Sequence, residues 1–241
     1  MEFDFPIEYP KEYPKDLLLK SSLLKHWIRT IDPSITIQKL KLNTIDIFPG
    51  PRVGFIECEV TYSRNDIVST EIFILSGGSV SIVPLIKCIE TGQIMTMLVK
   101  QPRIAFGGLT YEFPAGLADD STDYELTAIR EFKEECGISI NRSELIDVGQ
   151  IVHNETPTFH TFPQFFDEFV ATYVVKKAMT QKEIETIEGR NGGVDEDEQI
   201  TQHFVPFDDI CLFSQDAATL GICYLIKKLI ETKKINLDFE T

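Results

Sequence analysis

The chain has 241 residues, of which 43% are hydrophobic and 25% are charged, as in a soluble globular protein of one or two cores. Its formal net charge of −15 argues against a nucleic-acid or anionic-membrane partner, because both require clustered basic residues. Five widely spaced cysteines without a CxxC pair, and an acidic, proline-broken N-terminus, indicate free thiols in a cytoplasmic protein. An acidic protein can still bind an anionic small molecule if metal ions supply the opposing charge locally.

The first 75 residues are expected to form an extended arm, a short helix and a small antiparallel sheet. Prolines and tyrosines mark residues 1–15, and an amphipathic helix is predicted over 17–31. From Ile35 the apolar period becomes two, which predicts a strand that stops at Pro49-Gly50-Pro51 and then a hairpin with strands 53–62 and 67–75. Ser76-Gly77-Gly78-Ser79 is the best linker candidate, so we predict a first domain at 1–75 and a second at 76–241.

The second domain is predicted to alternate strands and helices, which places the chain in the α/β (α+β) class. Its predicted strands cover 81–89, 94–100, 111–113, 168–175 and 203–206, and its predicted helices cover 122–136, 181–188 and 216–233.

Three carboxylates crowd one edge of the predicted helix at 122–136. Glu131, Glu134 and Glu135 are three and four residues apart, so they lie along one face and repel one another. Such a cluster destabilises a protein unless a cation lies against it. The pattern therefore predicts a divalent metal site, because Mg²⁺ prefers carboxylate oxygen.

The same helix carries a longer motif. Gly116 precedes Arg130 by fourteen positions, and the chain continues Glu-Phe-Lys-Glu-Glu-Cys-Gly-Ile. This resembles the Nudix box G-x5-E-x7-R-E-U-x-E-E-x-G-U, in which U is an apolar residue. The departure is Thr122, which replaces the first glutamate and is instead predicted to begin the helix in a capping box with Glu125. The alternative interpretation is an exposed acidic helix that carries this run by coincidence.

The resemblance implies a fold and a metal. The implied fold is a Nudix α/β/α sandwich with a mixed sheet, preceded here by the small antiparallel subdomain. The implied metal is Mg²⁺, or Mn²⁺ in its place, which would activate water and neutralise phosphate oxygens. The metal ligands that it implies are Glu131, Glu134, Glu135 and the main-chain carbonyl of Ala115.

Segments before the box resemble the ADP-ribose and ADP-sugar pyrophosphatase branch of the family. Phe113-Pro114-Ala115-Gly116 is similar to its E-x-PAG signature, and residues 100–103 are similar to its E-Q-x-R element, with Lys100 in place of glutamate. The resemblance makes Arg103 a candidate substrate contact, and Glu168 a weaker one. A solvated arginine at the end of a strand is the alternative for Arg103.

An acidic loop at 192–200 resembles the loop that carries the catalytic glutamate in this branch. Glu198 is our candidate for the general base or for a ligand to the metal that holds the attacking water, and Glu196 is the second candidate. Glu134 of the box is also expected to take part in catalysis. The alternative is a run of charges that merely solvates a loop.

Taken together, the resemblance implies Mg²⁺-dependent cleavage of a nucleoside diphosphate sugar, such as ADP-ribose or ADP-glucose, into a nucleoside monophosphate and a sugar phosphate. It also implies a homodimer formed through the N-terminal segment. Two alternatives stay open: a UDP-sugar or dinucleotide pyrophosphatase, and a non-catalytic Nudix domain that binds a nucleotide sugar as a sensor.

Overall fold

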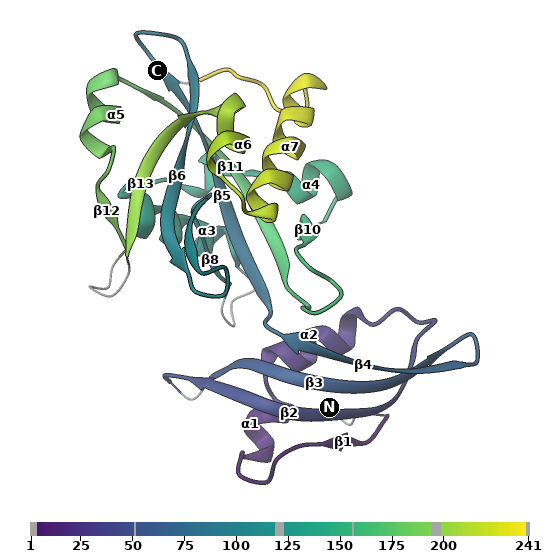
Figure 1. The fold of residues 1–241 in the computed structure, drawn as a ribbon. Coiled ribbons are helices and arrows are strands. Elements are labelled where there is room, and N and C mark those ends of the chain that lie inside the picture. The colour runs from purple at the N-terminus through teal and green to yellow at the C-terminus, as the bar shows by residue number, and fades with distance from the viewer. Residues whose placement is uncertain (1–3, 51, 119–122, 156, 194–198, 240–241) are drawn as a thin grey trace. The chain divides into compact units, whose positions relative to one another are not determined.

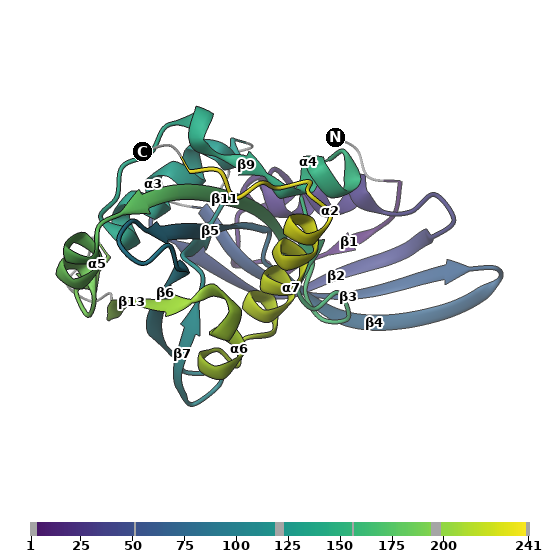
Figure 2. The same cartoon turned by 90° about the horizontal axis from the view of Figure 1, so that it is seen from above.

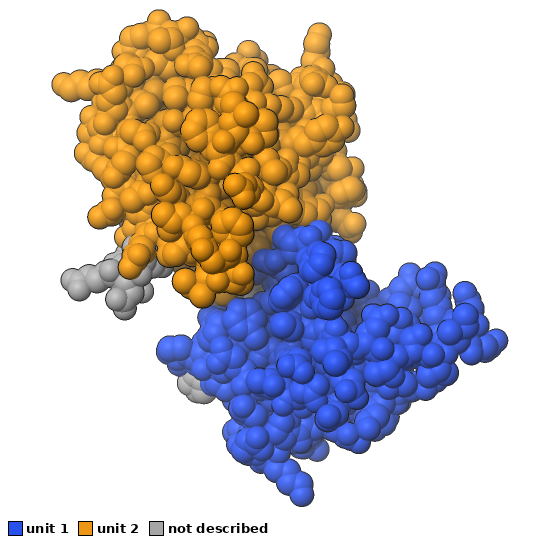
Figure 3. Space-filling model, in the orientation of Figure 1, with its two compact units in different colours: residues 1–78, 160–169 blue, residues 79–159, 170–241 orange. Residues whose placement is uncertain are grey.

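A computed structural model describes residues 4–50, 52–118, 123–155, 157–193 and 199–239. The chain forms two compact units, residues 1–78 with 160–169 and residues 79–159 with 170–241 (Figure 3). The division near Gly78 lies close to the predicted linker, but residues 160–169 join the first unit although our domain prediction placed them in the second. Backbone hydrogen bonds explain this difference, because Ile74 N donates to Phe165 O at 2.7 Å and Asp167 N donates to Ile74 O at 3.2 Å.

The first unit is a four-stranded sheet with two short helices (Figure 1). Its strands are β1 (Ile7–Glu8), β2 (Thr36–Phe48), β3 (Arg52–Arg64) and β4 (Ile67–Leu75), in the order β1-β2-β3-β4, and its helices are α1 (Lys15–Leu19) and α2 (Ser22–Thr30). The β3–β4 hairpin forms where the alternation predicted it. Asn65 and Asp66, with φ of 50° and 63°, make the two-residue turn that matches the twist of the strands.

The single helix predicted over 17–31 is divided in two. α1 ends at Leu19, and α2 begins after Ser21, whose side chain accepts a hydrogen bond from Leu24 N. A serine at this position favours a new helix start over a continuous helix. Leu18 and Leu24 then fill a core against the sheet, where Leu40, Leu42, Ile56 and Leu75 are also fully or almost fully buried.

The second unit is built on a nine-stranded sheet with helices on both faces. The strands, in chain order, are β5 (Gly78–Cys88), β6 (Ile94–Arg103), β7 (Gly108–Glu112), β8 (Ala115–Leu117), β9 (Ile146–Asp147), β10 (Phe159–His160), β11 (Phe169–Met179), β12 (Asn191–Gly192) and β13 (Ile200–Pro206). The main path is β10-β11-β5-β6-β13-β12, with β7 beside β6, β8 beside β5 and β9 beside β11. The helices are α3 (Tyr124–Cys136), α4 (Val148–His153), α5 (Gln181–Ile187), α6 (Ile210–Phe213) and α7 (Ala217–Glu231).

Helices α3 and α7 pack on the sheet of the second unit, and both can be followed in Figure 2. Two clusters of buried side chains show which helix covers which face. Phe132 of α3 packs with Ile82 and Tyr173 of the sheet. Ile226 of α7 packs with Val83 and Val174, which are the next residues along the same two strands. Successive side chains of a strand point to opposite faces, so α3 and α7 lie on opposite sides of the sheet. The predicted mixed α/β fold is confirmed, although the short helices α4 and α6 were not predicted.

None of the described helices combines the length and the apolar character needed to cross a membrane.

Candidate active site

Helix α3 carries the three clustered glutamates, and both of its ends are defined by local chemistry. Asp123 is its N-cap and accepts a hydrogen bond from Leu126 N at 3.1 Å. Gly137 ends the helix in the left-handed conformation at φ +69°. The helix begins at Tyr124 after its N-cap Asp123, one residue beyond the predicted cap Thr122, which itself lies outside the described residues. Aspartate serves as well as threonine at an N-cap.

The glutamates lie along the edge of α3 beside its buried face. Glu135 is 6% exposed, and the side chains of Glu131 and Glu134 are 13% and 29% exposed. Arg130 contacts two of them, with Nη2 2.6 Å from Glu131 Oε1 and Nη1 2.7 Å from Glu134 Oε2. Burial alone would lower the pKa of Arg130, but the two carboxylates outweigh it and raise that pKa. The guanidinium thus stays charged and orients both carboxylates.

The segment that precedes α3 in the chain lies directly against two of these carboxylates. Ala115 N donates to Glu135 Oε2 at 3.0 Å. A Cβ atom at Gly116 would lie 2.0 Å from Glu131 Cδ, so with any larger residue the Glu131 carboxylate would have to shift. Strand β8 and helix α3 are separated in sequence, but Ala115 and Gly116 bring them into contact at Glu135 and Glu131. This contact accounts for the glycine of the motif, fifteen residues before Glu131.

The chemistry of this donor set suits a hard divalent cation. Three partly buried carboxylates on one helix edge are the ligands that Mg²⁺ and Mn²⁺ prefer. As placed, the described residues form no group of three or more His, Cys, Asp or Glu side chains at metal-holding geometry. Arg130 holds Glu131 and Glu134, while Ala115 N holds Glu135, so a cation would have to compete with these contacts for the same oxygens.

A second charged group lies on β6 and β7. Arg103 Nε donates to Glu112 Oε1 at 2.8 Å, and Nη2 donates to Oε2, so the pair is bidentate. Thr110 and Gln101 also donate to Glu112, which is 9% exposed. Burial disfavours the carboxylate form of Glu112, but the hydrogen bonds from Arg103 and Thr110 hold its pKa below the ordinary value.

Arg103 lies within electrostatic range of α3. The hydrogen bond to Glu112 raises the pKa of Arg103, and the charges of Asp216 and Glu135 raise it further, so Glu135 is within electrostatic range. The Arg103 side chain is 48% exposed and so available to a ligand. Our sequence prediction placed Glu112 in a short strand but did not name it as a site residue, although it occupies the glutamate position of the E-x-PAG signature.

The chain around β12 is attached to the C-terminal end of α3. Gly193 N donates to Glu134 O at 3.0 Å, and the buried Gln202 donates through Nε2 to Glu135 O. A Cβ atom at Gly192 would lie 2.2 Å from that same carbonyl oxygen. Nothing in the strand pattern singled out Gln202, because its contact is made across 67 residues of sequence.

Of the remaining predicted site residues, two lie outside the described residues and one belongs to the first unit. Glu196 and Glu198 lie outside the described residues, although Gly193, just before them, is bonded to α3. Glu168 belongs to the first unit, where it accepts a hydrogen bond from Thr161 Oγ1. It is therefore not among the side chains that the second unit brings together.

Comparison with known proteins matches the family model described as "NUDIX domain" to residues 80–222. The chain is 25% identical to Nudix hydrolase 14, chloroplastic, of Arabidopsis thaliana over 84% of this chain and 69% of that protein. It is 27% identical to the Methanol dehydrogenase activator of Bacillus methanolicus, over 65% of this chain and 72% of that protein.

A shorter sequence match and a solved structure agree with the family model and with the two relatives above. Putative nudix hydrolase 2 of Caenorhabditis elegans is 44% identical over 62 residues, which are 26% of this chain and 27% of that protein. A solved structure described as an ADP compounds hydrolase has the same fold, with a TM-score of 0.56 and 16% identity, covering 82% of this chain and 97% of that one. The family match covers more than half of the chain and includes the whole glutamate cluster, so this protein belongs to the Nudix hydrolase family.

Proposed function

We propose that this protein hydrolyses the diphosphate of a nucleoside diphosphate sugar of the ADP-ribose or ADP-glucose type, releasing a nucleoside monophosphate and a sugar phosphate. The observation that carries the proposal is the junction of β8 with α3, where Ala115 and Gly116 lie against Glu135 and Glu131. The fold shared with an ADP compounds hydrolase supports an adenine-containing substrate.

The proposed metal is Mg²⁺, with Mn²⁺ as a substitute. Glu131, Glu134 and Glu135 would hold it, together with the carbonyl of Ala115. When bound, such a cation neutralises phosphate oxygens and lowers the pKa of a water molecule. Arg130 sets the orientation of two of these carboxylates before any ligand arrives.

In the proposed reaction the oxygen of water attacks one phosphorus atom of the diphosphate, and the bond from that phosphorus to the bridging oxygen breaks. Glu198 accepts the proton that water loses, and Glu196 is the second candidate for this role. Arg103, held in place by Glu112, binds a phosphate oxygen of the substrate through its exposed edge.

One observation favours a second candidate, a Nudix domain that binds a nucleotide sugar without cleaving it. The described carboxylates are engaged by Arg130 and Ala115 N rather than converging on one point. A sensor could keep this arrangement, whereas an enzyme must exchange these contacts for a metal ion.

The deciding experiment incubates the protein with Mg²⁺ and ADP-ribose, ADP-glucose, UDP-glucose or a diadenosine polyphosphate, and identifies the products by chromatography. We expect AMP and a sugar phosphate from one of the ADP-sugars. Glu135→Gln should abolish turnover, because it removes a ligand charge and keeps the side-chain volume. Glu231→Gln, an exposed carboxylate of α7, is the matched control and should leave the rate unchanged.

Binding of a nucleotide sugar without products would favour the sensor. Turnover that survives Glu135→Gln would contradict the proposed metal site. Mn²⁺ binding, followed by electron paramagnetic resonance, should weaken in the same variant and so separates loss of metal from loss of chemistry.

We also propose that the protein works in a reducing compartment. All five cysteines are free, and four of them are buried. This fits a cytoplasmic protein that needs no disulfide bonds.

A further inference from the structure

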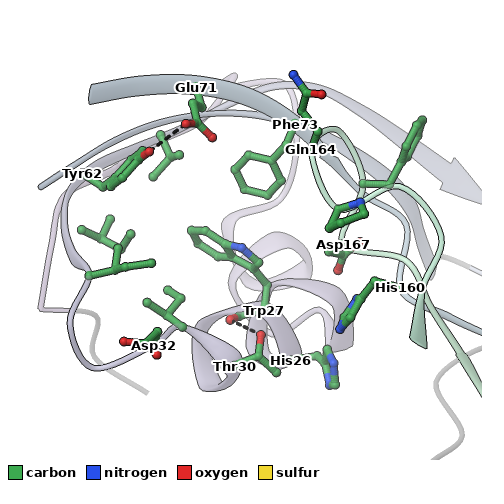
Figure 4. Close-up of a pocket in the computed structure, with 16 residues that line it drawn as sticks. His26, Trp27, Thr30, Asp32, Tyr62, Glu71, Phe73, His160, Gln164 and Asp167 are labelled. Carbon is green, nitrogen blue, oxygen red and sulfur yellow. Dashed lines mark hydrogen bonds between the residues drawn. The ribbon is translucent and has the colours of Figure 1, made fainter. Parts of the chain in front are cut away.

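The first unit contains a groove of its own, which the proposed hydrolysis does not use. It has a volume of about 430 Å³ and lies between α2, the inner face of β3 and β4, and residues 160–167 (Figure 4). All sixteen lining residues belong to the first unit. The volume is within the range of small-molecule sites.

Aromatic side chains, among them Trp27, Tyr62 and Phe73, line the groove. The ring centroids of Trp27 and Phe73 are 5.1 Å apart with their planes tilted by 35°. Tyr62 lies at one side, and its hydroxyl donates to Glu71 at 2.7 Å (Figure 4). The hydrogen bond keeps the carboxylate of Glu71 beside the rings, so an aromatic surface and a negative charge face the same space.

The charge of the lining is one-sided. Asp32, Glu71 and Asp167 contribute carboxylates, and none of the sixteen lining residues is lysine or arginine. Asp167 Oδ1 accepts from the amides of Ser76 and Gly77, while its Oδ2 is buried and has no hydrogen-bond partner among the described residues. Burial lowers the pKa of His26, so this histidine supplies no positive charge near neutral pH.

We propose that this groove binds a small organic cation, an ammonium group carried on an apolar body. A cation over the faces of Trp27, Phe73 and Tyr62 is attracted by the ring quadrupoles and by the carboxylates around them. A neutral aromatic compound could stack on the rings, but the carboxylates would not attract it. A free nucleotide would be repelled by the same carboxylates, so the site is chemically different from the one on α3.

The test can use the intact chain, because Trp27 is its only tryptophan. Its fluorescence therefore reports on this groove alone. We would titrate the protein with benzyltrimethylammonium and with choline, and compare 3,3-dimethyl-1-butanol, which has the shape of choline without its charge. Saturable fluorescence changes are expected with both cations, and the neutral compound should bind roughly threefold to thirtyfold more weakly.

Two variants locate the binding. Glu71→Gln should weaken the binding of both cations several-fold and leave the weak binding of the alcohol unchanged. Phe73→Leu should also weaken the binding of both cations. Melting curves will show whether each variant is folded. Glu59→Gln is the control, because it removes a carboxylate from the same strand pair at a position outside the groove lining.

Equal affinity for choline and the neutral alcohol would overturn the proposal, and so would the absence of a saturable change with either cation. An affinity unaffected by Glu71→Gln would place the cation elsewhere. None of these measurements depends on hydrolysis, so failure here leaves the proposed activity untouched, and the reverse also holds.

Discussion

At the scale of single residues, two glycines matter to the site because they leave room for neighbouring atoms, and one ion pair matters because of its charges. Gly116 and Gly192 have no side chain because a carboxylate and a carbonyl oxygen occupy the place of the missing Cβ. Arg103 and Glu112 act through their charges instead: the half-buried guanidinium and the buried carboxylate form an ion pair.

Replacing Gly116 tests the packing of the site. In Gly116→Ala the new Cβ would overlap Glu131 Cδ, so the carboxylate must move. We expect at least a tenfold loss in kcat together with weaker Mn²⁺ binding, measured by steady-state kinetics and paramagnetic resonance.

Gly221→Ala provides the control for this change. Gly221 lies within α7, and a Cβ atom added there would have open space around it to 4 Å. Alanine should therefore stabilise the helix by about 0.5–1 kcal/mol and leave kcat alone. Equal activities of the two variants would contradict the crowding argument.

Glu112 gives a prediction about pH. Its pKa is lower in the folded chain than the unfolded value of about 4.3, so its stabilising effect is present above that value and is lost as the pH falls through the lowered pKa. Glu112→Gln should therefore lower the free energy of unfolding by about 1–3 kcal/mol at pH 7, and the difference should narrow below about pH 4. Denaturant unfolding at several pH values measures this. A difference that stays constant with pH would contradict the ionic account.

At the scale of elements, the end of α3 is tied to the chain around β12 and β13. Three separate contacts converge on the carbonyls of Glu134 and Glu135, from Gly193, Gln202 and the backbone of Gly192. They fix the position of Gly193, the last described residue before the acidic loop, relative to the glutamates.

Replacing Gln202 tests this junction. Gln202→Leu keeps the volume but leaves Glu135 O without this donor, so we expect lower thermal stability and a fall in kcat larger than the change in KM. Gln202→Glu cannot donate to the carbonyl when ionised and should behave similarly. Gln150→Leu, at an exposed position on α4, is the control. A normal kcat in Gln202→Leu would show that the contact is only structural.

Much at this scale was predictable from the sequence. The alternation over 53–62 and 67–75 predicted the β3–β4 hairpin, and the spacing from Gly116 to Gly137 predicted α3. Local patterns decide such elements because the hydrogen bonds involved are local. The helix start was misplaced by two residues, since Thr122 and Asp123 are both good caps and sequence alone does not choose between them.

For the whole molecule, the first unit offers a surface for association. β4 is the last strand of its sheet. Ile74 near its end is bonded to residues 165–167, whereas Val68 and Ile72 on its outer face are 57% and 55% exposed. Exposed apolar residues on an edge strand favour pairing with another chain. We propose that two copies associate through β4 to form the homodimer.

Light scattering tests this association. The protein is expected to have the mass of a dimer, and Ile72→Lys should shift it to a monomer, because lysine on an edge strand opposes pairing. Tyr224→Lys changes a residue in the second unit that is 68% exposed and should leave the mass unchanged. A monomeric protein at micromolar concentration would contradict the proposal.

The amino-acid sequence alone predicted helix α3 with its glutamates, the β3–β4 hairpin and the Nudix family. Each of these predictions depends on residues that are close together in the chain or at fixed spacing. Three features became visible only in the folded chain: the residues that meet Glu131 and Glu135, the place of residues 160–169 in the first unit, and the groove of aromatic rings and carboxylates there. These features arise from contacts between segments far apart in the chain. No local pattern encodes such contacts, because they depend on how strands and helices pack.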